Sequence, residues 1–330
     1  VFPEKELDRL RKLYLAALRQ EKTQPTSMAL RVVPKLLYGE GHAYAQPLTG
    51  TGTEATLAAL SRDDLASFHA GWFKPNHATL IVVGPITVAT IKPQLEKLLG
   101  NWPAGDIPAK QITTVAPRPS RTLYLLDKPG ADQSVIFAGQ LIPPRADPDD
   151  IAIEAMNDVL GGQFTARLNM NLREDKHWAY GAYSFAYDAR GQRPLLAYAP
   201  VQTDKTTESL TEIRNEIAGI AGDRPATSEE VTLVKRSNTL SLPGQWETGG
   251  AILGSISELV EFGLPDDYWN NYAAAIRALT PDQVNKAARD YLHPSNLVIV
   301  VVGDRKLIEP GLKGLGFDTI QLIDADGELL

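Results

Sequence analysis

The spacing of apolar residues predicts both helices and strands along this chain. Steps of three and four residues separate the apolar positions of one segment, 206–221, and predict an amphipathic helix there: Leu210, Ile213, Ile217 and Ile220. Short apolar runs predict strands at 122–126 and 133–141. Strands mixed with runs of helices favour an α+β fold, in which a mainly antiparallel sheet carries helices on one side.

The segment 147–187 has the clearest local signals. Asp147-Pro148-Asp149-Asp150 is typical of a helix start, with a cap, a first-turn proline and carboxylates at the positive end of the helix dipole. Gly161-Gly162 predicts the end of that helix, and a second helix is expected from Phe164 to about Glu174. Aromatic residues then alternate with small ones in a predicted strand, 182–187. Tyr180 shares the parity of the small residues, so the pattern places it on their face.

The chain contains an internal repeat. Residues 60–84 and 279–303 align without a gap at an offset of 279 − 60 = 219 positions. The identical pairs are Leu60/Leu279, Asp63/Asp282, Pro75/Pro294, Val82/Val301, Val83/Val302 and Gly84/Gly303. Each copy predicts a helix that begins with a capping box, then a proline turn and a strand, 78–83 in the first copy and 297–302 in the second. A chance likeness between two such units is the alternative, and the length of the match favours duplication.

The repeat divides the chain into two units. Prolines at 108, 117 and 119 and weak apolar periodicity predict a linker at 106–120. The second unit then occupies 121–330, and its motif at residue 280 lies 280 − 122 = 158 residues after its first strand, whereas only 60 residues precede the matching position, Ser61, in the first copy. We therefore expect duplicated α/β sandwich units, the first of which, 1–105, is a carboxy-terminal part lacking roughly 100 residues at its front. The chain is then a fragment or a truncated paralogue.

Composition narrows the classes of function. The 330 residues are 43% apolar and 22% charged, as expected of a globular protein with a substantial core. The 33 basic and 40 acidic residues give a net charge of −7 without a basic stripe, so nucleic acid is not an expected partner. Apolar runs are far shorter than the ~20 residues of a membrane helix, so no membrane span is expected. The lack of cysteine excludes disulfides and thiolate zinc ligands, and leaves cytoplasm and periplasm open.

Generic catalytic motifs are missing from the sequence. It has no G-x-S-x-G elbow, no P-loop and no G-x-G-x-x-G loop. Its five histidines never pair at i and i+4 beside a carboxylate, and His69 and His77 are more typical of surface residues than of metal ligands. We expect no metal or cofactor site within this chain, and no nucleophile motif supports an independent hydrolase.

One block, residues 160–184, is distinctive: LGGQFTARLNMNLREDKHWAYGAYS. It resembles the second-domain signature of the insulinase, pitrilysin and mitochondrial-processing-peptidase family, whose zinc-bearing member carries an inverted H-x-x-E-H motif. Further landmarks extend the resemblance over essentially the whole chain: Leu37-Tyr38-Gly39 with His42-Ala43-Tyr44, Pro75-Asn76 and Gly263-Leu264-Pro265. The resemblance implies duplicated α+β domains that face each other across a chamber.

The resemblance also implies a role for Arg173 and Tyr180. In the family, an arginine and a tyrosine with this seven-residue spacing reach from the second domain to the zinc site of the first. A guanidinium is a fixed fork of donors for a peptide carbonyl or carboxylate, and a phenol O–H stabilises a developing oxyanion. The alternative is structural: an arginine at a helix end paired with Glu174 or Asp175, and a strand tyrosine that fills core.

The chain departs from the family pattern at the metal. H-x-x-E-H occurs nowhere, and its expected place precedes residue 1 of the first unit. The family's third ligand, a glutamate, lies on a helix that we match to 4–20, where registering on Pro25 puts Ala17 at its position and Glu21 a turn further on. Zinc is therefore expected in a partner or in a missing domain, as in family members that work as heterodimers.

These observations predict a non-catalytic, inactive-type subunit or fragment of a zinc metallopeptidase. It would bind peptide or unfolded protein, pair with a subunit that bears H-x-x-E-H, and supply Arg173 and Tyr180 to that subunit's zinc site. The alternative is a structural or assembly protein of the same fold without a proteolytic role. A periplasmic or otherwise exported location is expected from the paired bacterial members of the family, and a cytoplasmic one stays open.

Overall fold

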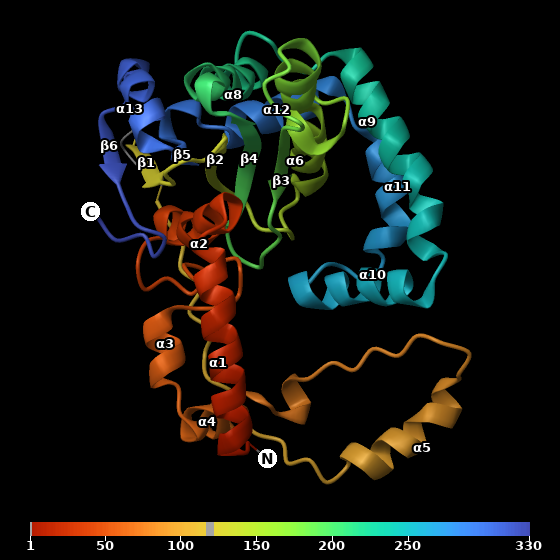
Figure 1. Ribbon diagram of the computed structural model, residues 1–330. Coiled ribbons are helices and arrows are strands. Elements are labelled where there is room, and N and C mark those ends of the chain that lie inside the picture. The colour runs from red at the N-terminus through yellow and green to blue at the C-terminus, as the bar shows by residue number, and fades with distance from the viewer. Residues whose placement is uncertain (1, 117–121) are drawn as a thin grey trace.

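A mixed six-stranded sheet forms the centre of the computed structural model, which describes residues 2–116 and 122–330 (Figure 1). The strand order is β3-β4-β2-β5-β1-β6, with bounds β1 (Thr122–Asp127), β2 (Gln133–Ile142), β3 (Tyr183–Ala186), β4 (Arg193–Gln202), β5 (Val298–Gly303) and β6 (Thr319–Leu322). Neighbours from β3 to β5 are antiparallel, whereas β1 is parallel to both β5 and β6. The predicted α+β class is confirmed, with parallel pairs at one side of the sheet.

The helices fall into two groups along the chain, and α3, α4 and α5 lie away from the sheet (Figure 1). Those before the predicted linker are α1 (Glu4–Glu21), α2 (Pro25–Tyr38), α3 (Glu54–Ala59), α4 (Arg62–Trp72), η1 (Pro75–His77) and α5 (Val88–Leu99). Those after β2 are α6 (Asp150–Asn157), η2 (Asp158–Gly162), α7 (Arg167–Asn169), η3 (Met170–Asp175), η4 (Thr203–Lys205), α8 (Thr206–Ala221), α9 (Ser228–Ser241), η5 (Leu242–Trp246), α10 (Gly249–Phe262), α11 (Tyr268–Ala278), α12 (Pro281–Tyr291), η6 (Pro294–Asn296), α13 (Arg305–Leu312) and η7 (Lys313–Leu315). Within residues 2–116 and 122–330, no helix combines the length and apolar character needed to cross a membrane.

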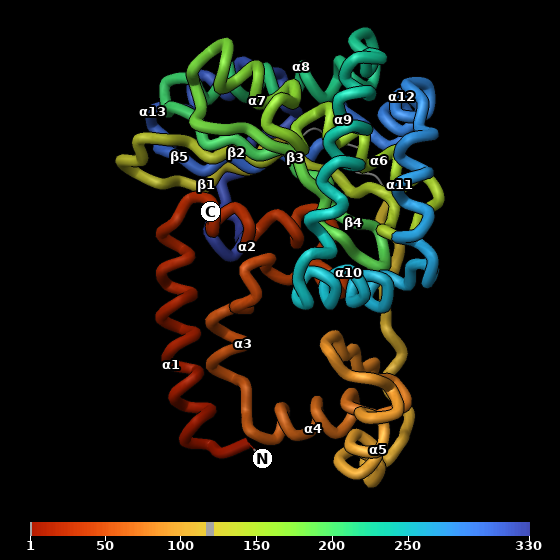
Figure 2. The backbone as a smooth tube through the Cα atoms, turned by 90° about the vertical axis from the view of Figure 1, so that its right-hand side faces the viewer, coloured from red at the N-terminus to blue at the C-terminus, as the bar shows by residue number. Residues whose placement is uncertain are grey.

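Each face of the sheet has its own hydrophobic core. Odd-numbered positions of β1 and β5, such as Leu125 and Val301, pack with α6, α8 and α12 on one face. Even-numbered positions, such as Leu126 and Val300, pack with α2 on the other. Figure 1 shows these helices above and below the sheet, and Figure 2 shows the same layers from the side. Helices that follow the predicted linker thus cover one face of the sheet, and α2, which precedes that linker, covers the other.

Several local predictions are confirmed. Helix α8 spans the predicted 206–221, and complete capping boxes start α4 at Ser61, α9 at Thr227 and α12 at Thr280. The predicted start of α6 is wrong by two residues, because Asp147 accepts a hydrogen bond from the Asp149 N–H in a turn (2.9 Å) and the helix begins at Asp150 instead of Pro148. The second predicted helix, 164–174, is shorter: α7 begins at Arg167 and continues as the π-helical η3.

The predicted strand at 78–83 is wrong. This segment has no strand structure, and none of the described residues from 54 to 116 is buried. A strand requires a neighbour for its backbone N–H and C=O groups, and none of the described strands lies beside 78–83. The predicted linker has no regular structure at 106–116, and 117–120 lies outside the described residues. The division of the chain into two units stays a prediction.

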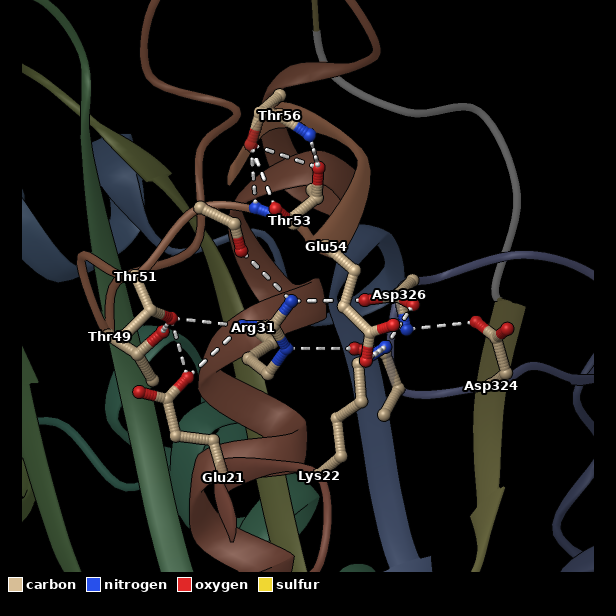
Figure 3. A network of polar contacts seen from close by, with 12 residues as sticks. Glu21, Lys22, Arg31, Thr49, Thr51, Thr53, Glu54, Thr56, Asp324 and Asp326 are labelled. Atoms are coloured by element: carbon tan, nitrogen blue, oxygen red, sulfur yellow. Dashed lines mark hydrogen bonds and ion pairs between the residues drawn. The ribbon is translucent and has the colours of Figure 1, made fainter. Parts of the chain in front are cut away.

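A polar network joins the first and last parts of the chain (Figure 3). Arg31, on α2, has a side chain only 1% exposed and forms ion pairs with Glu21 (3.0 Å) and Asp326 (3.0 Å). Its guanidinium also donates to the Thr51 hydroxyl (3.1 Å) and the Gly52 carbonyl (3.0 Å). Because these partners come from α1, the loop after α2 and the C-terminal turn, Arg31 connects α2 to three other segments.

Candidate functional site

Arg173 lies in an unusual helical turn. The chain from Met170 to Asp175 is π-helical, a geometry that is rare and often occurs at functional sites. His177 follows with φ 58°, a left-handed conformation, and its Nδ1 lies 3.0 Å from the Arg173 carbonyl oxygen. The chain therefore reverses directly after the π turn and returns toward β3.

Two aromatic rings flank the Arg173 guanidinium. Its central carbon lies 4.7 Å from the centroid of the Phe164 ring and 5.4 Å from that of Tyr180. Such cation–π contacts contribute roughly 0.5–1 kcal/mol at exposed sites. Glu174 is a further neighbour, with 3.4 Å between its Oε1 and Arg173 Nε. The structure thus brings both predicted site residues together and adds Phe164, while retaining the pairing with Glu174.

The sequence pattern places Tyr180 on the face of the strand that carries the small residues, and this prediction is wrong. Ala179 pairs with Val201 and Tyr183 pairs with Tyr198, so four steps on one side oppose three on the other. An extra residue of this kind is a β-bulge, which redirects side chains. The small residues Ala182 and Ser184 are buried as predicted, whereas Tyr180 is 84% exposed. Tyr180 therefore does not fill core.

Asn169 holds the two aromatic segments in place, and sequence reasoning missed it. This side chain is fully buried; its Nδ2 donates to the Phe164 carbonyl (2.7 Å), and its Oδ1 accepts from the Ala182 N–H (3.2 Å). The sequence signal that could have identified Asn169 was its polar side chain between Leu168 and Leu172, on a helix that is otherwise expected to be buried. Phe164 carried no comparable signal, because its approach to Arg173 depends on the π turn.

The site presents hydrogen-bond donors to solvent on one surface. Arg173 offers a guanidinium whose side chain is 30% exposed, and Tyr180 offers a phenol O–H. Both are suited to a carbonyl, a carboxylate or an oxyanion. The arrangement can bind and polarise a peptide group that another centre attacks.

The positions considered as zinc ligands, Ala17 and Glu21, lie on α1. Within 2–116 and 122–330, no three His, Asp or Glu side chains gather as metal ligands. Ala17 is exposed on α1 and has no ligand atom. Glu21, one turn further along α1, accepts hydrogen bonds from Arg31 (3.0 Å) and the Thr51 hydroxyl (2.7 Å), so its carboxylate helps to hold α2 in place. No chemistry at a metal is assigned to these residues.

Known proteins are similar to this chain in sequence and in fold. The chain is 26% identical over 232 residues to an uncharacterized zinc protease of Bacillus subtilis. The aligned region covers 69% of this chain and 54% of that protein, so the chain spans about half the length of this relative. It is 20% identical over 308 residues to a non-peptidase homolog of Helicobacter pylori, covering 92% and 69%. The solved peptidase M16 inactive domain from Pseudomonas fluorescens matches with a TM-score of 0.83 at 24% identity, over 92% of this chain and 71% of that one.

The sequence pattern of one family matches the chain directly. The pattern described as the peptidase M16 inactive domain covers residues 59–238. The matched segment includes the first repeat copy, the predicted linker, Arg173 and Tyr180. Because it covers more than half of the 330 residues, the chain belongs to the peptidase M16 inactive domain family.

Proposed function

We propose that this chain is the non-catalytic half of a zinc peptidase. It binds an extended peptide and presents Arg173 and Tyr180 to a zinc site formed by a partner chain or another domain that carries H-x-x-E-H. The single observation that carries this proposal is the partly exposed guanidinium of Arg173 between the Phe164 and Tyr180 rings, on a turn that Asn169 holds in place.

The edge of the sheet supports the peptide-binding part of the proposal. Strand β3 directly follows the bulge at Tyr180 and pairs with β4 alone, so its other side has no strand neighbour among the described residues. An extended peptide can add to such an edge through main-chain hydrogen bonds, which tolerate varied side chains. A peptide on β3 would then run past Tyr180.

A structural or assembly role without proteolysis is the second candidate. The H. pylori relative that covers 92% of this chain is named a non-peptidase homolog. In such a protein, Arg173 and Tyr180 would contact no substrate. The high exposure of Tyr180 and the partial exposure of Arg173 favour the first candidate, because a purely structural pair would be expected in the core or in the sheet ladder.

Reconstitution tests the proposed function. The chain is mixed with a purified family member that bears H-x-x-E-H, and cleavage of a fluorogenic peptide is measured. We expect activity to require both chains, and Arg173→Ala and Tyr180→Phe each to lower kcat by roughly 100-fold, as loss of an oxyanion donor does.

Matched controls remove the same groups elsewhere on the surface. Arg236→Ala on α9 and Tyr14→Phe on α1 change exposed residues of the same type, and both should retain full activity. Full activity of Arg173→Ala and Tyr180→Phe would overturn the assigned roles. Assembly with the partner but no cleavage by any mixture would favour the structural candidate.

We also propose an exported, periplasmic-type location, which the cysteine-free composition supports. Fractionation of the source cells, with an antibody against the chain, tests it. Recovery in the cytoplasmic fraction alone would contradict it.

A further inference from the structure

Phe164 differs from Arg173 and Tyr180 in the chemistry that it can offer. Its side chain is 54% exposed, but its ring carries no hydrogen-bond donor or acceptor. A single exposed apolar side chain is ordinary on a protein surface. What distinguishes Phe164 is its contact with the Arg173 guanidinium, whose central carbon lies 4.7 Å from the ring centroid. Any effect of this ring on chemistry must therefore act through Arg173.

Hydrogen bonds fix the backbone beside Phe164. Its carbonyl oxygen accepts from Nδ2 of the buried Asn169 (2.7 Å). The carbonyl of Gln163 accepts from the Ala166 N–H (3.1 Å), and the Gln163 side chain donates to Asn238 on α9 (3.3 Å). Burial of a polar side chain such as Asn169 is costly unless it is hydrogen-bonded, so this segment is held firmly. The position of the ring is therefore set mainly by its own side-chain torsions.

The backbone at Arg173 is fixed as well. It lies in the π-helical turn 170–175, and its carbonyl oxygen accepts a hydrogen bond from Nδ1 of His177 (3.0 Å). The guanidinium, by contrast, stands at the end of a long and flexible side chain, which loses much rotamer entropy when it is held in one position. Contacts that hold the guanidinium beforehand reduce this loss when a substrate carbonyl binds. The Phe164 and Tyr180 rings are such contacts.

Glu174 is a competing partner for the guanidinium. Its Oε1 lies 3.4 Å from Arg173 Nε, and both side chains are partly exposed. An exposed ion pair and an exposed cation–π contact stabilise by similar, small amounts. Loss of the Phe164 ring is therefore enough to shift the guanidinium toward the carboxylate. A guanidinium that pairs with Glu174 through its fork of donors has fewer N–H groups left for a substrate.

We propose that Phe164 is a positioning residue for Arg173. Its ring and that of Tyr180 hold the guanidinium between them and away from full pairing with Glu174, so that the free N–H groups face a substrate carbonyl. Phe164 itself contacts no substrate in this role. The inference rests on the function proposed above, and it adds a third residue to the Arg173 and Tyr180 pair.

Reconstitution with a family member that bears H-x-x-E-H tests the effect on catalysis. We expect Phe164→Leu to lower kcat by roughly 2- to 5-fold with KM unchanged, as loss of one exposed cation–π contact in the transition state would. Phe164→Tyr keeps the face of an aromatic ring and should retain the wild-type kcat. The matched control is Phe68→Leu, which removes a ring of similar exposure (58%) from α4 and should leave kcat unchanged.

A double variant separates positioning from a purely structural role. Glu174→Gln removes the competing charge, so Phe164→Leu combined with Glu174→Gln should recover most of the lost kcat. The gain from Glu174→Gln should be larger without the ring than with it, which the single variant measures. A ring that only stabilised the fold would show no such recovery, because Glu174→Gln adds no packing at 164. No recovery, or a loss in Phe164→Tyr as large as in Phe164→Leu, overturns the proposal.

Nuclear magnetic resonance of the whole chain alone tests the positioning without a partner. The Nε–H signal of Arg173 is assigned by its loss in Arg173→Lys. Because a group above an aromatic face is shielded by the ring, Phe164→Leu should move this signal downfield. Phe164→Tyr and Phe68→Leu should leave it in place.

The outcomes separate the two proposals. If no mixture of chains cleaves the peptide, the proposed function is overturned, and the Arg173 signal alone decides whether Phe164 holds the guanidinium. A signal that does not move in Phe164→Leu overturns the positioning role, whether or not the mixtures are active. Full kcat of Phe164→Leu in an active mixture overturns it as well, even if the signal moves.

Discussion

The two copies of the internal repeat share a sequence pattern but differ in structure. In the second copy, α12 leads through η6 into β5, which pairs with β2 and β1 at the centre of the sheet. In the first copy, α4 and η1 form in the same order, but the following segment, 78–83, forms no strand. Val301 is fully buried, whereas its counterpart Val82 is 47% exposed.

The difference shows which elements depend on neighbours. Helices α4 and α12 both begin with a capping box, because the hydrogen bonds of a helix start are made within a few residues. A strand makes its hydrogen bonds to other strands, which lie far away in sequence. The same apolar pattern therefore becomes β5 in one copy and an irregular segment in the other.

The largest expected change in the free energy of unfolding comes from placing a charge at one of the two matched valines, Val301 and Val82. Val301→Asp places a carboxylate in the core between the sheet and its helices, and should lower the free energy of unfolding by more than about 3 kcal/mol or prevent folding. Val82→Asp should change it by less than about 0.5 kcal/mol. Urea denaturation followed by circular dichroism measures both. Equal destabilisation by the two variants would mean that 78–83 is packed in solution.

Substituting alanine at the matched glycines, Gly303 and Gly84, should change the stability of the chain by a smaller amount. A Cβ at Gly303 would lie 2.5 Å from Ser134 Oγ and 3.0 Å from Ile308 Cδ1, whereas one at Gly84 would meet nothing within 4 Å. Gly303→Ala should therefore destabilise the chain by about 1–3 kcal/mol through overpacking. Gly84→Ala should be neutral or slightly stabilising, since alanine restricts the unfolded chain. Thermal melts compare the two, and an unchanged Tm for Gly303→Ala would contradict the tight contact.

The matched helix caps should give the smallest effect. Thr280→Ala removes the hydroxyl that accepts from the Gln283 N–H, and should cost about 1 kcal/mol because α12 packs on the sheet. Ser61→Ala removes the equivalent bond at α4, which has no buried residue, so the main unfolding transition should not move. A shift of that transition by Ser61→Ala would show that α4 unfolds together with the sheet.

The candidate site was only partly predictable. The block 160–184 identified Arg173 and Tyr180, and the structure places both at one surface. Phe164 and Asn169 were missed because their contacts arise from the π turn and from the bulge, and neither feature leaves a periodic pattern in the sequence.

The sequence by itself determined the elements whose signals are local. Helix α8, the capping boxes at Ser61, Thr227 and Thr280, and the apolar runs of β1, β2 and β5 follow from spacing and short-range hydrogen bonds. Only the tertiary structure decided that α2 covers the second face of the sheet, that 78–83 stays out of it, and that Tyr180 points to solvent. Each of these depends on which surfaces and strand edges meet, and that is settled by packing between segments far apart in the chain.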